Sequence, residues 1–303
     1  MDSTMLKNHL LTLCPEMKLL EHEPMSRHTT FRIGGEVALM AFVKNEAEFQ
    51  CALKAAHEEQ IVPYVVGNGS NILAADGAID RFVIVTCEGL NQLERTGERE
   101  ITCGAGVSMA RAATFAMEQG LTGMEFAHGI PGTVGGGIYM NAGAYGGEMK
   151  DVAVESRYLT LGGEEGVLHG EEQKLTYRHS AYSEGDKFVT SVVFHLEAGN
   201  RDEIRSKMAE LAEKRRSRQP LDKPSAGSTF KRPVQGYAAA LIEQCGLKGY
   251  TVGGAQVSEK HSGFVINCGG ATCADVVALT DHVHEVVLEQ TGIELEMEVR
   301  RLS

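Results

Sequence analysis

The sequence predicts an α+β protein of three units, and three observations support this. The chain has 303 residues, more than one small domain usually holds. Its hydrophobic content of 43% with 23% charged residues is typical of a globular protein with a sizeable core. Along the chain, a start of mixed helix and strand is followed by a strand-rich middle and a smaller mixed end. We expect the three units to cover residues 1–85, 86–199 and 200–303.

The first unit is predicted to alternate helix and strand. After an irregular lead-in over residues 17–32, residues 46–60 place apolar side chains at helical spacing, which predicts an amphipathic helix. Short apolar runs at residues 61–66 and 81–87 predict two strands.

The middle unit is predicted to be mainly antiparallel sheet. A short strand at 100–103 precedes a helix over 107–119, which Gly120 ends. The segments 152–161 and 187–196 are then rich in β-forming residues and have turn residues close by. This pattern is typical of antiparallel strands.

The last unit is predicted to begin with a charged helix over 201–218, followed by a proline-containing hinge. Two further helices and two short strands complete it, at 237–244, 274–290, 264–267 and 295–302.

Charge and cysteine usage exclude several classes of function. The net charge of −12 argues against a broad nucleic-acid or anionic-membrane surface, because both need positive charge. No apolar run approaches the length that spans a bilayer, and the N-terminus lacks a secretory pattern. The seven cysteines form no C-x-x-C pair, and no His, Asp or Glu cluster has metal-ligand spacing. We expect a reduced, cytoplasmic protein without a metal.

The first glycine motif follows a predicted strand and reads Gly67-Asn68-Gly69-Ser70-Asn71. A Rossmann site is disfavoured, because Ile72 occupies the third glycine position and no clear helix follows. The segment is nevertheless suited to a nest of backbone N–H groups around a phosphate. An ordinary turn at the end of a strand is the alternative.

The second glycine motif covers residues 129–147, where eight of 19 positions are glycine. Apolar residues are interspersed, so the segment is folded and is no flexible linker. Its backbone amides suit an extended anion, while a tightly wound structural loop is the alternative. The chain contains no P-loop motif.

Three downstream residues are candidates for chemistry. Ser228 follows a glycine and precedes Lys231 and Arg232, so its hydroxyl could be polarised to donate a proton to a carbanion. Arg178 lies in a polar segment at 177–182. Glu298 shares one side of a predicted strand with Glu296; a carboxylate there suits a general acid, but spacing alone does not choose between the two. The alternatives are a turn cap for Ser228, a surface ion pair for Arg178 and an exposed strand face for Glu298.

Taken in order, these segments resemble the UDP-N-acetylenolpyruvoylglucosamine reductase family of peptidoglycan precursor synthesis. The matching segments are 29–35, 67–73, 129–147, 177–182, 226–233, 260–264 and 298–300. They run from about residue 27 to the C-terminus, so the resemblance covers nearly the whole chain.

The resemblance implies a vanillyl-alcohol-oxidase-like (PCMH-type) fold in which the first two domains hold FAD. The third, smaller α+β domain would close over the substrate, UDP-N-acetylglucosamine enolpyruvate, with NADPH as co-substrate and no protein partner. The implied catalytic residues are Arg178, Ser228 and Glu298. The implied FAD contacts are Gly67, Asn68, Gly69, Ser70, Asn71, Gly129, Ile130, Pro131, Gly132, Thr133, Gly135, Gly136, Asn141, Ala142 and Gly143. The implied substrate contacts are Tyr177, Lys231, Arg232 and Arg218.

Two departures from the family pattern stand out. The stretch between Phe188 and Gln219 is short, which indicates a compact subtype without the extra substrate-covering loop. Arg232 stands where other members carry Asn. The main alternative function is another FAD oxidoreductase of the same fold, such as an alcohol or lactone oxidase. A non-enzymatic nucleotide-binding protein is the second alternative.

Overall fold

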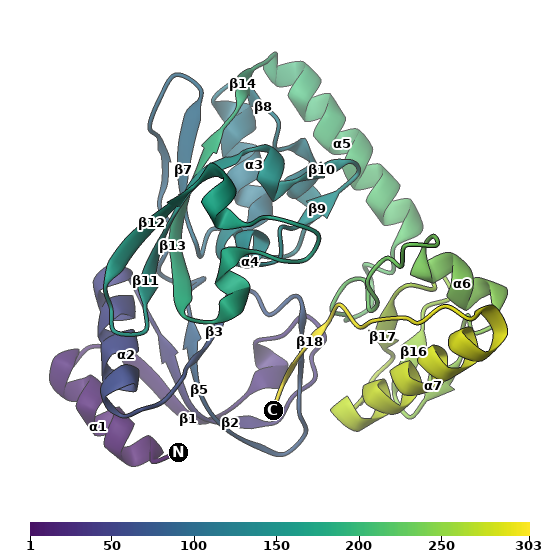
Figure 1. Cartoon of the computed structure of the whole chain (residues 1–303), viewed down its shortest axis with the longest axis horizontal. Coiled ribbons are helices and arrows are strands. Elements are labelled where there is room, and N and C mark those ends of the chain that lie inside the picture. Colours follow the sequence, from purple (N-terminus) through teal and green to yellow (C-terminus); the bar gives the residue numbers. More distant parts are fainter. The chain divides into compact units, whose positions relative to one another are not determined.

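A computed structural model describes residues 1–303 and divides them into two units, each assembled from separate stretches of sequence (Figure 1). Unit 1 comprises Met1–Glu21, Ala38–Asn68 and Arg81–Lys214, and unit 2 comprises His22–Val37, Gly69–Asp80 and Arg215–Ser303. The grouping differs from the expected consecutive ranges, because segments 22–37 and 69–80 belong with the end of the chain. The division at residues 85 and 199 stays a prediction.

The main sheet of unit 1 has five antiparallel strands in the order β12-β11-β13-β7-β6. Its strands are β6 (Leu93–Arg95), β7 (Glu100–Gly104), β11 (Ala153–Thr160), β12 (Glu165–His169) and β13 (Lys187–His195). The predicted antiparallel middle is therefore confirmed. A register shift between Arg157 and Tyr158 marks a bulge where β11 pairs with β13.

A second sheet has four strands in the order β1-β2-β5-β3, with β3 parallel to β5. The strands are β1 (Lys18–Pro24), β2 (Glu36–Phe42), β3 (Tyr64–Val66) and β5 (Ala78–Val85). The expectation of an irregular lead-in over 17–32 was wrong, since β1 lies within it. As an edge strand, β1 is nowhere fully buried and lacks the alternation that would reveal it.

The helices begin where short polar side chains cap them. The helices that begin in unit 1 are α1 (Ser3–Leu13), α2 (Glu46–Glu58), α3 (Met109–Glu118), α4 (Val134–Tyr139) and α5 (Arg201–Arg218). The side chain of Asn45 accepts a hydrogen bond from the Glu48 N–H, and Ser108 does the same for Arg111. The predicted helices over 46–60, 107–119 and 201–218 are confirmed, whereas α1 was not foreseen.

Shorter elements complete unit 1 and the connections. Two-stranded ladders join β8 (Leu121–Thr122) to β14 (Glu197–Ala198) and β9 (Gly143–Ala144) to β10 (Gly147–Glu148). The 3-10 turns are η1 (Met25–Arg27), η2 (Glu125–Gly129), η3 (Met149–Asp151), η4 (Gly170–Gln173) and η5 (Ala181–Glu184).

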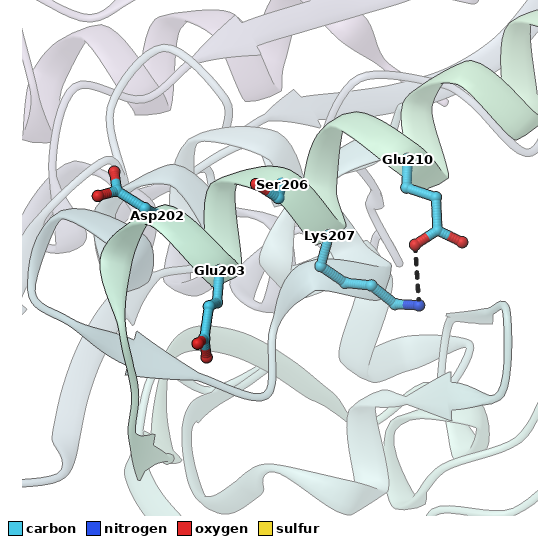
Figure 2. Close-up of a pocket in the computed structure, with 5 residues that line it drawn as sticks. All are labelled: Asp202, Glu203, Ser206, Lys207 and Glu210. Carbon is cyan, nitrogen blue, oxygen red and sulfur yellow. Dashed lines mark hydrogen bonds and ion pairs between the residues drawn. The ribbon is translucent and has the colours of Figure 1, made fainter.

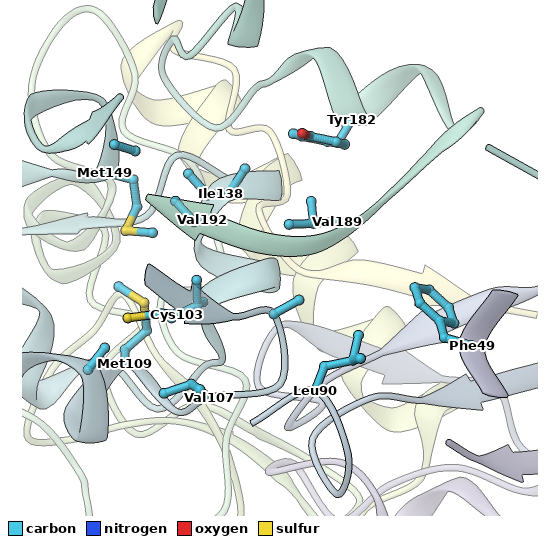
Figure 3. Packing of buried hydrophobic residues seen from close by; sticks show 14 of the residues in the cluster. Phe49, Leu90, Cys103, Val107, Met109, Ile138, Met149, Tyr182, Val189 and Val192 are labelled. Carbon is cyan, nitrogen blue, oxygen red and sulfur yellow. The ribbon is translucent and has the colours of Figure 1, made fainter. Parts of the chain in front are cut away.

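The core of unit 1 lies between its helices and its main sheet. Figure 3 shows Met109 of α3 and Ile138 of α4 among the buried residues that pack with Cys103 and Val192 of the sheet. Tyr182 is buried in the same cluster, and its hydroxyl donates to the Ser156 hydroxyl at 2.7 Å. Burial raises the pKa of both Tyr182 and Cys103 to about 12. These groups act as neutral core side chains.

Unit 2 packs two helices with a small antiparallel sheet. The sheet comprises β15 (Thr251–Val252), β16 (Ala255–Val257) and β17 (Val265–Asn267), the helices are α6 (Ala238–Gln244) and α7 (Cys273–Thr291), and β4 (Ile72–Ala74) pairs in parallel with β18 (Arg300–Leu302). Along α7, Val276, Leu279, Val283 and Val287 are fully buried at helical spacing. The strand predicted over 295–302 is shorter than expected.

The helix α7 begins with a capping box and ends at a glycine. Thr272 accepts from the Asp275 N–H, and the Asp275 carboxylate accepts in return from the Thr272 N–H. These backbone hydrogen bonds lower the pKa of Asp275. Gly292 follows the helix with φ of 71°, the left-handed conformation that favours glycine.

Two classes of structure are absent. No helix of the chain combines the length and apolar character needed to cross a membrane. No group of three or more His, Cys, Asp or Glu side chains could hold a metal ion.

The folded state of unit 2 should weaken at low pH because of His261. Burial lowers the pKa of His261 below 6.5, and its Nδ1 accepts a hydrogen bond from the Gly263 N–H at 3.2 Å. Since the unfolded chain binds this proton more tightly, the contribution of His261 is full above about pH 6.5 and is lost as the pH falls toward the lowered pKa.

We therefore expect the thermal unfolding midpoint of the native protein to fall relative to that of His261→Gln between about pH 7 and pH 5. Both proteins would be unfolded in parallel across this range, so that other titrating groups cancel. A constant difference between the two midpoints would show that His261 is not responsible.

Candidate active site

Two glycine-bearing segments that are far apart in the sequence meet in unit 1. The side-chain amide of Asn68 donates to the carbonyl of Pro131 at 3.0 Å. A Cβ atom on Gly67 would stand 2.2 Å from the Thr133 hydroxyl oxygen, closer than any real side chain allows. The strand end at Gly67 and the loop at 129–133 therefore form one structure, and glycine at position 67 makes their close approach possible.

Part of the glycine-rich segment serves internal packing. The Val134 and Gly135 N–H groups donate to the carbonyls of Val107 and Ala105 at 2.8 and 2.9 Å. A Cβ on Gly135 would lie 2.9 Å from the Cβ of Ala105. These two amides are engaged within the chain, so neither is available to an anion. At Val134 and Gly135 the segment is therefore a structural loop.

Other positions of the same segment are open. Gly136 is exposed, and a Cβ there would meet only the Thr133 hydroxyl, at the ordinary distance of 3.6 Å. The N–H groups of Gly132 and Thr133 make no hydrogen bond within the chain. Just before this loop, the Nδ1 atom of His128 is buried without a partner. Unpaired donors on a bare backbone fit a phosphate-bearing cofactor.

Arg178 lies on a tight turn of unit 1. Thr176 and His179 exchange backbone hydrogen bonds of 3.1 and 3.2 Å, which leaves Tyr177 and Arg178 at the two corners. Arg178 has φ of 56°, a left-handed conformation that few non-glycine residues adopt. Its guanidinium carbon lies 5.0 Å from the centre of the Tyr177 ring. The turn presents a half-buried cation beside an exposed aromatic ring.

In unit 2, the segments of Ser228 and Glu298 are joined through Thr229. The Glu298 N–H donates to the Thr229 carbonyl at 2.9 Å, and the Asn71 side chain donates to the Glu298 carbonyl at 3.3 Å. Thr229 is buried, and its hydroxyl accepts from the Val265 N–H. Ser228 is exposed next to this anchor. The structure therefore brings the hydroxyl-bearing and carboxyl-bearing segments together.

Two candidate cations of unit 2, Lys231 and Arg232, have partners within the chain. Lys231 forms an ion pair with Glu296, and its polarisation of Ser228 stays a prediction. Of the two carboxylates, Glu296 and Glu298, Glu296 is therefore the partner of Lys231. The guanidinium of Arg232 lies 4.1 Å from the centre of the Tyr237 ring.

The predicted residues are divided between the two units. Unit 1 holds Gly67, Asn68, the 129–143 segment, Tyr177 and Arg178, whereas unit 2 holds Gly69, Ser70, Asn71, Arg218, Ser228, Lys231, Arg232 and Glu298. Neither His128 nor Thr229 was predicted as a site residue. A lone histidine carries no spacing signal, and the role of Thr229 is visible only through its three hydrogen-bond partners.

A surface hollow on α5 involves none of these residues. Figure 2 shows that its lining comes from this one helix, by Asp202, Glu203, Ser206, Lys207 and Glu210, all exposed. Lys207 pairs with Glu210 at 3.3 Å, and Lys214 and Lys207 together lower the pKa of Glu210. Such exposed pairs contribute little to stability. The hollow is a charged, solvated helix face.

Comparison with known proteins gives consistent matches over the chain. Residues 37–167 match the FAD-binding domain model, and residues 219–302 match the model of the UDP-N-acetylenolpyruvoylglucosamine reductase C-terminal domain. The expected cofactor, FAD, is thereby supported by a match to its domain.

Curated relatives and a solved structure point the same way. The reductases of that name from Agathobacter rectalis and Caldanaerobacter subterraneus subsp. tengcongensis are 46% and 45% identical, covering 95% and 97% of both chains. The crystal structure of the reductase from Thermus caldophilus superposes with a TM-score of 0.81 at 32% identity. It covers 95% of this chain and 100% of that one. The predicted fold is confirmed.

Adjacent glycines of α4 should separate cofactor binding from folding. In Gly136→Ala the new methyl group has room, and alanine is a better helix former by about 1 kcal/mol. We expect the FAD-free protein to be at least as stable as before, while the Kd for FAD rises about tenfold, equivalent to about 1.4 kcal/mol. Fluorescence titration of FAD and thermal unfolding would measure the two effects.

Gly135→Ala is the matched control. Its methyl group would press on Ala105, so overpacking should lower the stability of the FAD-free protein by about 1–3 kcal/mol. An unchanged FAD affinity in Gly136→Ala would show that the open side of this loop is not a cofactor surface.

Proposed function

The chain belongs to the UDP-N-acetylenolpyruvoylglucosamine reductase family, so we propose that it uses NADPH to reduce UDP-N-acetylglucosamine enolpyruvate to UDP-N-acetylmuramate. The observation that carries the proposal for this chain is the anchor at Thr229. The Glu298 N–H donates to its carbonyl next to Ser228, so a hydroxyl and a carboxyl come from adjoining backbone segments. Paired donors of this kind suit protonation of a carbanion.

The cofactor would be held by the open side of the glycine-rich loop. The unpaired N–H groups of Gly132 and Thr133 suit its phosphates, and Gly136 leaves room for them. The segment from Gly67 to Asn71 would add further contacts from the strand end. When bound, FAD supplies the hydride transfer that no side chain can provide.

Arg178 is proposed to bind the carboxylate of the enolpyruvyl group. Its guanidinium is planar, permanently charged and able to bind two oxygens at once. Negative charge develops on the α-carbon and this carboxylate when hydride adds to the β-carbon. A fixed cation stabilises that charge more than it stabilises the ground state. The tight turn that bears Arg178 limits the reorganisation needed when substrate binds.

Ser228 is proposed to protonate the α-carbon, and Glu298 to assist as a protonated acid. Ser228 is exposed, so its hydroxyl is accessible to a substrate. Glu298 is half-buried, and its backbone is held on both sides, by Thr229 and Asn71. Lys231 pairs with Glu296, which supports assigning the acid to Glu298 and not to Glu296.

The remaining proposals concern the surroundings of the reaction. Tyr177, Lys231, Arg232 and Arg218 are proposed to contact the sugar nucleotide. We also propose a cytoplasmic location, because all seven cysteines are free, as is typical of a reducing compartment. No protein partner is required by the proposed chemistry.

Ser228→Ala should separate the two half-reactions. Reduction by NADPH does not need a proton donor to the substrate, so its rate should be unchanged. Reoxidation by the sugar nucleotide should slow about 10²-fold or more, the usual contribution of a general acid. Stopped-flow absorbance at the flavin band would follow both steps. Equal losses in both steps would exclude the proton-donor role.

Anaerobic reoxidation distinguishes the proposed reductase from an oxidase of the same fold. After NADPH bleaches the flavin band, UDP-N-acetylglucosamine enolpyruvate should restore it without oxygen. Mass spectrometry should then detect a product two hydrogens heavier than the substrate. Restoration by oxygen alone would favour an alcohol or lactone oxidase, and a colourless protein would favour simple nucleotide binding.

A further inference from the structure

The side chain of Asn141 is hydrogen-bonded within the chain and closed to solvent. Its side chain is fully buried, at 0% exposure. Its amide nitrogen donates to the Glu148 carboxylate at 2.8 Å and to the Thr176 carbonyl at 3.1 Å. Its amide oxygen accepts from the Lys150 N–H at 2.9 Å. Both donors and the acceptor are engaged within the chain, so the side chain is poorly suited to the FAD contact expected for it.

The partners of Asn141 lie in two different segments. Glu148 and Lys150 directly follow the glycine-rich segment, and Thr176 opens the turn that carries Arg178. Asn141 itself has φ of 42°, a left-handed conformation that asparagine tolerates better than most residues. One buried amide group therefore ties the glycine-rich segment to the turn of Arg178.

Ser180 holds the other end of the same turn. It is fully buried, and its hydroxyl donates to the carbonyl of Tyr139, two residues before Asn141. The distance is 2.9 Å. The turn over Thr176–His179 is thus fastened at both ends to residues 139–141. Arg178 lies at a corner of this turn in an unfavourable left-handed backbone conformation. The hydrogen bonds of Asn141 and Ser180 stabilise the turn in that conformation.

We propose that Asn141 is a positioning residue that fixes the Arg178 turn against the glycine-rich segment. Through this link, the segment assigned to the cofactor also determines where the guanidinium meets the substrate carboxylate. Asn141 acts through Arg178 and contacts neither substrate nor FAD. The inference rests on the carboxylate-binding role proposed for Arg178.

Asn141→Asp tests the link with almost no change in shape. It keeps an acceptor for the Lys150 N–H but removes both donors and sets a carboxylate against Thr176 and Glu148. In the FAD-loaded protein, flavin content and the rate of NADPH reduction should stay within about twofold. The kcat/KM for the sugar nucleotide should fall about 10²-fold, the effect of a misplacement of roughly 1 Å.

A double-mutant cycle with Arg178→Gln identifies the route of the effect. If Asn141 acts through Arg178, Asn141→Asp should cost less than about threefold once Arg178 is already replaced. Asn141→Gly, which accepts the left-handed backbone and adds no charge, should behave in the same way. Asn45→Ala is the control, because it removes a helix-capping side chain of the same unit without touching the turn. It should leave kcat/KM unchanged.

The outcomes separate this inference from the proposed function. If both Asn141 variants lose FAD, or if the effects in the double-mutant cycle are additive, the positioning role of Asn141 is wrong. Neither result contradicts the proposed reductase function. A native protein that the sugar nucleotide does not reoxidise would overturn the proposed function, and the inference with it. An active protein insensitive to Arg178→Gln would overturn the role of Arg178 and therefore the inference.

Discussion

The contact between Gly67 and Thr133 is the constraint on which the organisation of unit 1 depends. A side chain at position 67 would stand 2.2 Å from the Thr133 hydroxyl, so the two backbones can approach only because Gly67 has none. Asn68 then bonds the Pro131 carbonyl, and the loop continues into α4, whose first amides bond the chain at Ala105 and Val107. The amides of Gly132 and Thr133 are left without partners on this frame.

The glycine-rich segment therefore serves two purposes at neighbouring positions. Gly135 is required because Ala105 packs against it, whereas a Cβ on Gly136 would meet only the Thr133 hydroxyl, at an ordinary distance. The amino-acid composition does not distinguish Gly135 from Gly136, because each is one glycine in a cluster. Their different roles follow from which side of the short helix α4 faces the sheet and which side does not. The alternative of a structural loop therefore holds at Gly135, while anion binding by the neighbouring positions stays a prediction.

Much of the fold was predictable because long periodic segments carry their own signal. The helix predicted over 201–218 is α5, with Ile204, Met208 and Leu211 buried along one face. The edge strand β1 escaped prediction because it has no regular alternation of buried residues, whereas the helix α1 was not predicted although Leu6 and Leu10 are buried at helical spacing. The grouping of residues 22–37 and 69–80 with the end of the chain was also not predicted. The parallel pairing of β4 with β18 joins residues that are about 230 positions apart in the sequence, and no local sequence pattern predicts such a pairing.

The sequence by itself determined the family, the cofactor class and the residue types available for catalysis, because motifs and their order can be recognised without a structure. It also indicated alternation near the C-terminus, where Leu295 and Val299 are indeed buried. Only the tertiary structure decided how those residues are held. It paired Lys231 with Glu296, joined Glu298 to Thr229, and tied the Arg178 turn to Asn141. These are hydrogen bonds and ion pairs, most of them between segments distant in sequence, and such geometry exists only once the chain has folded.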